Sequence, residues 1–209
     1  MNQQFRRLSL SLIVLAFSSA PAFAHHLMGG HTPATFGEGI LSGLGHPVIG
    51  LDHFAAVVAV GCLAAAHRAA YALVMAFVLA MMAGVALHLH GATVPGAEIL
   101  VALSVIALGA LMLGDRQMPV SAALILFAIV GGVHGYALGE SIYGAEPTPL
   151  YAYLLSLAIV QSAIALTAAT FARSLIQRRG ADLSPLRLVG AGIAGIGLAV
   201  LMQQVIPAA

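Results

Sequence analysis

Long apolar stretches separated by short polar turns make up most of this chain. Each stretch holds about as many residues as an α-helix needs to cross a hydrocarbon core of ~30 Å, although the third is only just long enough. The six stretches are Gly45–Ala66, Ala70–Leu89, Ala97–Leu113, Val120–Gly139, Leu150–Phe171 and Leu186–Ile206. Glycine, proline and charged residues fill the breaks, and no long soluble loop remains. The pattern predicts an all-α membrane protein with six transmembrane helices.

A shorter apolar run near the start has the layout of a signal peptide. Arg6 and Arg7 precede the run Leu8–Phe17, and the small-residue pattern Ala22-Phe23-Ala24 follows it. We therefore expect residues 1–24 to be a signal peptide cleaved after Ala24, and residues 25–209 to form the transmembrane domain. The alternative is an uncleaved first membrane helix, for which the run is short because a span needs ~20 residues.

Composition supports the same class of protein. Hydrophobic residues make up 61% of the 209 residues and charged residues only 7%, against roughly 25% charged in soluble domains. A water-soluble globule is therefore excluded. The single cysteine, Cys62, cannot form an internal disulfide, and the scattered arginines form no basic stripe for nucleic acid. The chain contains no lysine, so it has no P-loop lysine for ATP.

The arginines predict the orientation in the membrane. With the mature N-terminus outside the cytoplasm, the loops after the first, third and fifth spans are cytoplasmic, and all arginines of the mature chain lie in or beside them. These are Arg68, Arg116, Arg173, Arg178, Arg179 and Arg187. This matches the positive-inside rule. We expect a multi-pass protein of the bacterial inner membrane with both mature termini in the periplasm.

On this map, eight of the nine histidines lie toward the outer face, and only His67 lies with the arginines. The eight are His25, His26, His31, His46, His53, His88, His90 and His134. The outermost three, His25, His26 and His31, predict a mouth that collects a metal cation. For His88 and His90, at a helix end, a simple hydrogen bond to a carbonyl is an equally good interpretation.

The first span carries three polar side chains within eight residues: His46, Asp52 and His53. On a continuous helix the two imidazoles lie two turns apart on one face, with Gly50 leaving room between them. Pro47 lacks an N–H and disfavours helical geometry in the residue before it, so we expect a kink or a fresh helix start there. Such groups are expensive in lipid unless they are used, which favours a functional site.

The fourth span carries His134 and, at its outer end, Glu140. Gly131, Gly135 and Gly139 form two overlapping GxxxG steps beside His134 and predict close approach of another helix. Imidazole and carboxylate ligands suit Ni²⁺, Co²⁺, Zn²⁺ and Cu²⁺, whereas Mg²⁺ and Ca²⁺ prefer oxygen shells. The predicted cargo is a first-row transition metal.

These motifs resemble a known family. Residues His46 to His53 match the HPxxGxDH signature of HupE/UreJ proteins, and Val133 to Glu140 resembles their span-four motif, with Val133 in place of a phenylalanine. The resemblance covers the whole chain. It implies a secondary nickel or cobalt permease that is not an enzyme, holds no prosthetic group and is linked indirectly to hydrogenase or urease maturation proteins. It places His46, Asp52 and His53 at the metal site, with His134 and Glu140 as span-four partners.

Two other functions share most of these residues. One is an intramembrane zinc hydrolase in which Glu140 activates water. The other is a non-transporting metal-delivery or assembly factor, although no soluble domain for that role is present.

The arrangement of three spans followed by three spans permits an inverted repeat. Self-association through the glycine seams into a homo-oligomer stays open, as does the choice between nickel and cobalt.

Overall fold

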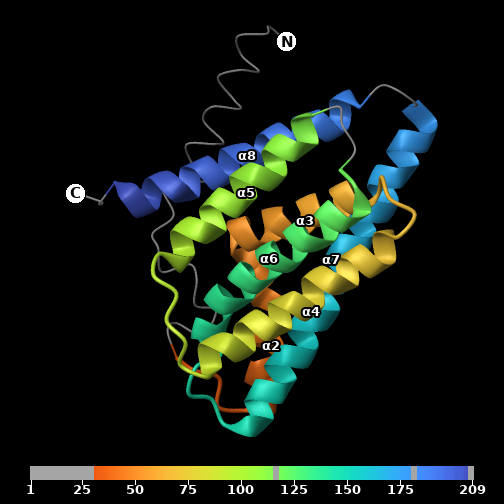
Figure 1. The fold of residues 1–209 in the computed structure, drawn as a ribbon. Helices are drawn as coiled ribbons and strands as arrows, with labels where there is room; N and C mark the ends of the chain where they lie inside the picture. Colours follow the sequence, from red (N-terminus) through yellow and green to blue (C-terminus); the bar gives the residue numbers. More distant parts are fainter. Residues whose placement is uncertain (1–30, 115–117, 180–182, 207–209) are drawn as a thin grey trace, which may run out of the picture.

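The computed structural model describes residues 31–114, 118–179 and 183–206, and the part of the chain so described is helical, without strands. The predicted signal peptide, His25 and His26 lie outside these residues. The helices are α2 (Phe36–Ile49), α3 (Leu51–Ala64), α4 (Ala70–Leu89), α5 (Ala97–Leu113), α6 (Val120–Gly139), the short 3₁₀ helix η2 (Glu140–Ile142), α7 (Pro147–Arg179) and α8 (Ser184–Val205) (Figure 1).

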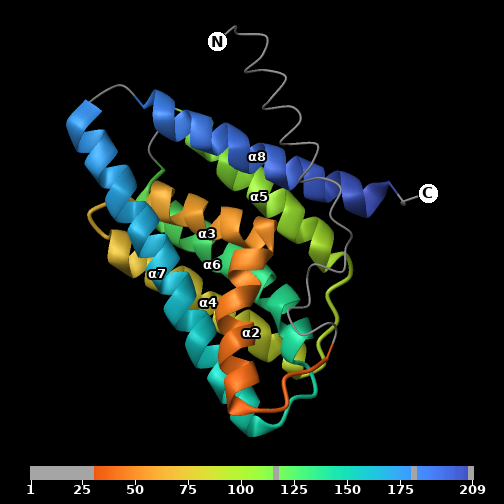
Figure 2. The same cartoon turned by 180° about the vertical axis from the view of Figure 1, so that it is seen from behind.

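The helices pack mainly in three groups. Helix α4 lies against α6, α5 lies against α8, and the long α7 packs on both α2 and α3 (Figures 1 and 2). Helix α3 is the centre of the molecule, because it contacts every other α-helix described. Its buried positions are small or β-branched, which lets several neighbours approach its backbone; they include Ala55, Ala56, Val57, Ala59, Val60 and Gly61.

Glycines make this close packing possible. A Cβ atom at Gly131 or Gly135 of α6 would collide with backbone carbonyl oxygens of α4, and one at Gly139 would lie 2.7 Å from the Cβ of His88. The predicted close approach along this glycine seam is therefore confirmed, and the neighbouring helix belongs to the same chain. Similar contacts join Gly43 and Gly61 to α7 and Gly109 to α8.

The predicted stretches and the observed helices agree best in the middle of the chain. Helices α4, α5 and α6 have the predicted limits, while α7 continues to Arg179 and α8 begins at Ser184. The first stretch differs most. It begins at Phe36 and consists of two helices, because the capping box of Thr35 and Glu38 starts α2 well before the apolar run. A count of apolar residues alone does not detect this amphipathic N-terminal part of α2.

Four helical segments are long and apolar enough to cross a membrane: α4, α6 with η2, α7 and α8. The bent pair α2–α3 passes the same test as a broken span or re-entrant loop, and α5, with 17 residues, is shorter. The described chain thus has four or five candidate spans, and a count of six requires both the bent pair and α5 to cross.

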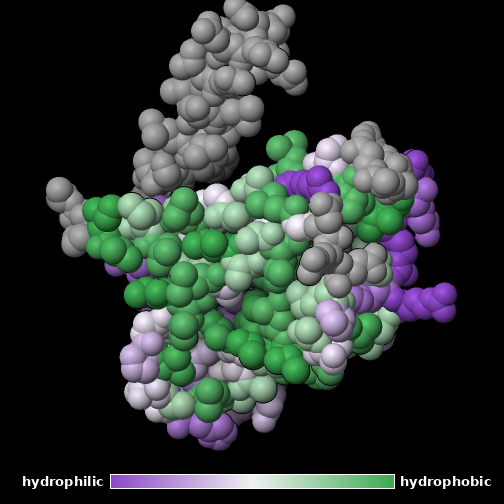
Figure 3. Space-filling view, turned by 45° about the horizontal axis from the view of Figure 1, so that its top comes forward, coloured by the Kyte–Doolittle hydropathy of each residue, from purple (hydrophilic) through white to green (hydrophobic). Residues whose placement is uncertain are grey.

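Apolar side chains cover the outside of the bundle. Leu79, Ile125 and Leu188 are 67%, 61% and 76% exposed. Figure 3 shows hydrophobic residues over the broad middle of one face, with most hydrophilic residues toward its edges. Such a surface is stable only in contact with lipid, so the chain is a multi-pass membrane protein.

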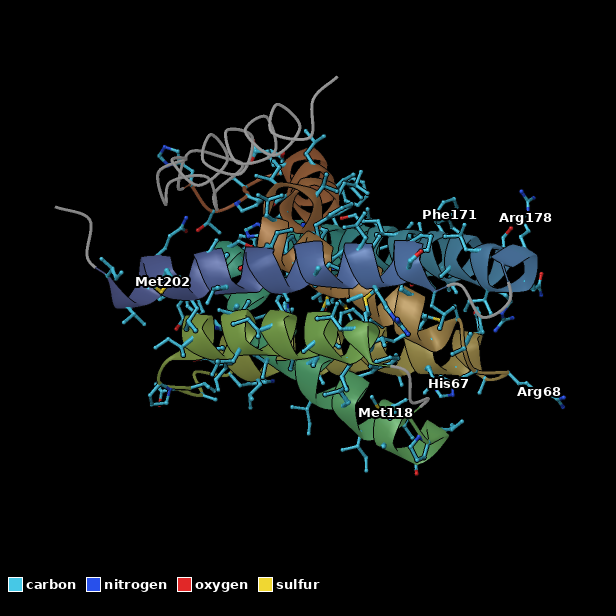
Figure 4. All side chains as sticks on the ribbon, turned by 90° about the horizontal axis from the view of Figure 1, so that it is seen from above. His67, Arg68, Met118, Phe171, Arg178 and Met202 are labelled. Carbon is cyan, nitrogen blue, oxygen red and sulfur yellow. The ribbon has the colours of Figure 1, made fainter. Side chains whose placement is uncertain are left out.

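The described arginines gather at one end of the bundle, where α3 and α7 end. Figure 4 shows Arg68 and Arg178 at this end with His67, while Met202 of α8 lies at the other. Arg173 joins the two helix ends, because its Nη2 donates to the carbonyl of His67 at 2.6 Å. Cations are favoured at helix C-termini, where carbonyl groups lack partners.

The pairing of the spans is symmetric. Numbering the apolar stretches in chain order, the first packs on the fifth, the second on the fourth and the third on the sixth. If the first stretch is exchanged with the fourth, the second with the fifth and the third with the sixth, the set of pairs stays the same. This pattern is compatible with a repeat of three plus three helices.

Candidate metal centre

The candidate centre is built on a sharp bend between α2 and α3. The two helix axes turn by 77° at Gly50, whose ψ of 99° is extended and interrupts the helix for one residue. The expected break in the first span is confirmed, but it lies at Gly50 and not at Pro47, which remains inside the last turn of α2. Pro47 has no N–H to donate to the carbonyl of Gly43, so the last turn of α2 lacks this hydrogen bond.

Glycine at the bend also leaves room for the polar side chains. A Cβ atom on Gly50 would lie 3.0 Å from Cδ2 of His53 and 3.2 Å from Oδ1 of Asp52. Both side chains therefore fold closely over the Gly50 backbone. A larger residue at this position would push them away.

Asp52 lies in the first turn of α3 and is 2% exposed. Its Oδ1 accepts the backbone N–H of His53 at 2.8 Å. The N-terminus of a helix carries partial positive charge, which stabilises a carboxylate there. The bend therefore creates a helix start at which a negative charge can be buried.

A chain of hydrogen bonds fixes the orientation of His53. Ser104 of α5 donates its hydroxyl hydrogen to the carbonyl of Val101 at 2.7 Å, so its Oγ accepts from Nε2 of His134 at 2.8 Å. Nδ1 of His134 is then the unprotonated nitrogen and accepts from Nδ1 of His53 at 2.8 Å. His53 is left with a lone pair on Nε2, which is the atom that can bind a metal.

His46 completes the group from the other side of the bend. It is 7% exposed, and its ring centroid lies 6.3 Å from that of His53. Two imidazoles that share a metal at about 2.1 Å from each nitrogen have centroids at most about 6.5 Å apart. The spacing of His46 and His53 is close to this limit, so a cation could lie between them only with the two nitrogens on nearly opposite sides of it. On a straight helix the two residues would be about 10.5 Å apart along the axis, so the bend brings them together.

The group is not a closed metal cage. Within the described residues, no three side chains of His, Cys, Asp or Glu already surround a single point. His134 uses both ring nitrogens in hydrogen bonds, so in this arrangement it positions His53 and does not offer a lone pair. The side chains at the bend that could donate a lone pair to a cation are those of His46, His53 and Asp52.

The other predicted site residues lie elsewhere. Glu140 is exposed and follows the buried His134 by six residues, about 9 Å along the helix axis, so the structure does not bring the two together. His31 is exposed at the start of the described chain, and His90 is exposed at the end of α4. His25 and His26 lie outside the described residues.

Comparison with known proteins decides the family. A model described as "HupE / UreJ protein" matches residues 12–200 of this chain. The chain belongs to the HupE/UreJ family. It is similar to "Protein HupE" of Rhizobium leguminosarum bv. viciae, with 34% identity over 138 residues, which are 65% of this chain and 68% of the relative. No solved structure matches it significantly.

This HupE/UreJ chain has a second cluster of rings between α4 and α6. The ring of His88 lies 4.7 Å from that of Tyr136 and 5.7 Å from that of Tyr143, measured between centroids. The hydroxyl of Tyr136 donates to the carbonyl of Ala92 at 2.8 Å and accepts the N–H of Val94 at 3.0 Å. These contacts tie the loop after α4 to α6, and they give Tyr136 a structural role.

Two polar residues of the interior were missed by the sequence analysis. Ser104 ends the hydrogen-bond chain of the candidate metal centre, and Gln161 of α7 is fully buried. Serine is common in membrane helices because it can bond to its own backbone, so Ser104 gave no distinct signal. Gln161 was detectable in principle, since a glutamine inside an apolar stretch needs a partner.

Proposed function

We propose that this protein is a secondary transporter that imports Ni²⁺, or Co²⁺, across the bacterial inner membrane and so supplies hydrogenase or urease maturation. One observation carries the proposal: His46, Asp52 and His53 are buried together at a helix bend inside a lipid-facing bundle. Intramembrane groups of this kind are expensive, and they mark ion pathways.

The donor set supports a transition-metal cargo. Two imidazoles and a carboxylate suit nickel and cobalt, whereas calcium and magnesium prefer oxygen atoms alone. A permeating ion must bind well enough to enter and weakly enough to leave. A set of three donors that does not already enclose the ion fits this requirement, because water can keep the remaining coordination positions.

The proposed direction of transport follows from the arginine distribution. With the arginine end in the cytoplasm, His25, His26 and His31 collect the cation on the periplasmic side, and the bend passes it inward. An inside-negative potential favours entry of a divalent cation by about 4.6 kcal/mol per 100 mV, so no ATP is required. In this proposed orientation, Glu140 lies near the periplasmic end of α6.

Radiolabelled nickel uptake tests the proposal. The protein is expressed in a strain that lacks other nickel importers, and unlabelled cobalt is added as a competitor. We expect uptake above the empty-vector level, and inhibition by cobalt. Uptake of nickel and of cobalt at the empty-vector level would contradict the proposal. Turnover of a lipid or peptide by purified protein, without metal entry into sealed vesicles, would favour the zinc hydrolase instead.

A further inference from the structure

Gln161, on the long helix α7, has a fully buried side chain that the metal centre does not explain. It is 0% exposed, and neither its amide oxygen nor its amide nitrogen has a hydrogen-bond partner among the described residues. Buried amides are nearly always paired, because burying one without a partner costs free energy. An amide with both ends unpaired can bind a ligand or water beside it.

The packing of α7 places Gln161 opposite the bend. Tyr153 and Leu157, two turns and one turn before Gln161, lie against Gly43 of α2, and one turn after Gln161, Ala165 lies against Gly61 of α3. Residues four apart lie on the same helix face, so Gln161 shares the face of Leu157 and Ala165. Its amide therefore faces the part of α2 and α3 that lies between Gly43 and Gly61.

Helix lengths show that this part is the corner of a triangle. From Tyr153 to Ala165, α7 covers about 18 Å, whereas the residues from Gly43 to Gly61 would cover about 27 Å as one straight helix. A 77° bend at Gly50 shortens the second distance to about 21 Å, close to the length of α7 between the two contacts, because α2 and α3 form two sides of the triangle and α7 the third. Figure 2 shows α7 running across the open side of this bend. Gln161 thus lies on the face of α7 that is turned toward the bend with His46, Asp52 and His53.

We propose that Gln161 is a further binding station for the cation, opposite His46, Asp52 and His53. Its amide oxygen accepts hydrogen bonds from the water shell of a divalent transition-metal ion, or binds the ion directly, while its NH₂ group donates to another water. A neutral amide adds a donor without adding charge, so it helps the ion past the corner without trapping it. This inference rests on the proposed transport function.

The test compares three variants in the full-length protein: Q161L, Q161E and Q177L. Gln177 is exposed on the same helix and provides the matched control. Initial nickel uptake is measured over a range of concentrations, and thermal unfolding is measured on the purified variants. For Q161L we expect roughly tenfold lower uptake at subsaturating nickel, because a contact to a charged species is lost. Its unfolding temperature should not fall, because an unpaired amide has been removed.

Q161E keeps oxygen donors and adds a charge. We expect it to restore uptake at low nickel and to lower the half-saturating concentration, while Q177L behaves as wild type. Wild-type uptake by Q161L, or equal losses in Q161L and Q161E, would overturn the inference and leave the proposed transport function intact. If Q161L does not accumulate in the membrane, the inference is tested with Q161E alone. A half-saturating nickel concentration in Q161E equal to that of the wild type then overturns the inference. Absence of uptake by the wild-type protein would refute the transport function and this inference together.

Discussion

Two histidine clusters in this protein use the same residue type in different ways. In the bend cluster, His46, His53 and His134 are buried, and hydrogen bonds to His134 and Ser104 fix which nitrogen of His53 keeps its lone pair. In the outer cluster, His88 is half-buried and contacts the rings of Tyr136 and Tyr143. A histidine in a membrane helix is therefore not enough to indicate a ligand.

The neighbours of each ring explain the difference. The bend cluster has a buried carboxylate, Asp52, at a helix start, so a positive ion there is compensated. In the outer cluster, Gly139 lets α6 approach His88 closely, and the hydroxyl of Tyr136 is occupied by the loop backbone. The bend cluster is therefore our candidate for metal passage, whereas the ring contacts of the outer cluster join α4 and α6.

The largest effect is expected from changes to the donors at the bend. Asp52→Asn keeps the volume and removes only the charge, and we expect nickel uptake to fall by about a hundredfold. His46→Ala and His53→Ala should also abolish most uptake. Uptake is measured in cells alongside immunoblots of the membrane fraction. Normal flux in Asp52→Asn, at wild-type protein level, would show that the carboxylate is not needed.

Ser104 tests whether the hydrogen-bond chain orients His53. Ser104→Ala removes the group that accepts from His134, and loss of such outer partners commonly costs tenfold or more, so we expect uptake to fall by roughly tenfold. Ser121→Ala, an exposed serine on α6, is the matched control. If both variants transport equally, the chain of hydrogen bonds has no role in transport.

Acidity distinguishes potential-driven entry from proton symport. Neutral imidazole has a lone pair for metal and imidazolium has none, so protons compete with the cation at more than one ring. At fixed membrane potential and subsaturating nickel, initial uptake between pH 8 and pH 5 should decline more steeply than a single titration allows. A rise toward pH 6 would instead indicate a proton-coupled mechanism.

The smallest effects are expected outside the bend. His88→Phe keeps an aromatic ring against Tyr136, and we expect the saturated uptake rate to change by no more than about twofold. Replacing His25, His26 and His31 together should raise the half-saturating nickel concentration and leave the saturated rate nearly intact. A loss of saturated rate in either protein as large as that in Asp52→Asn would remove the distinction between the two regions.

The sequence was sufficient for most of the helices. The limits of α4, α5 and α6 follow from their apolar runs, because lipid permits no other spanning structure for such segments. It was not sufficient for α2, where a capping box and an amphipathic face start a helix before the apolar run. Hydropathy alone also does not reveal a bent pair of helices, so it predicts six spans where the described chain has four or five candidates.

The metal centre could be predicted in part. His46, Asp52 and His53 share one motif, so their proximity was expected, and the structure also brings His134 beside them. The role of Gly50 as the corner, the partnership of His134 with Ser104 and the position of Gln161 depend on how three other helices pack. Packing between distant segments leaves no local signal in a single sequence. Glu140 shows the converse, because proximity to His134 in sequence did not place it in the same cluster.

The most direct test of the central claim is metal entry into proteoliposomes that contain only this protein. Nickel influx is recorded at a series of imposed inside-negative potentials for the wild type and for Asp52→Asn. We expect influx into wild-type vesicles to rise with potential without added ATP, and influx with Asp52→Asn to stay near that of empty vesicles. Equal influx with both proteins, or none with the wild type at any potential, would contradict metal passage through the bend cluster.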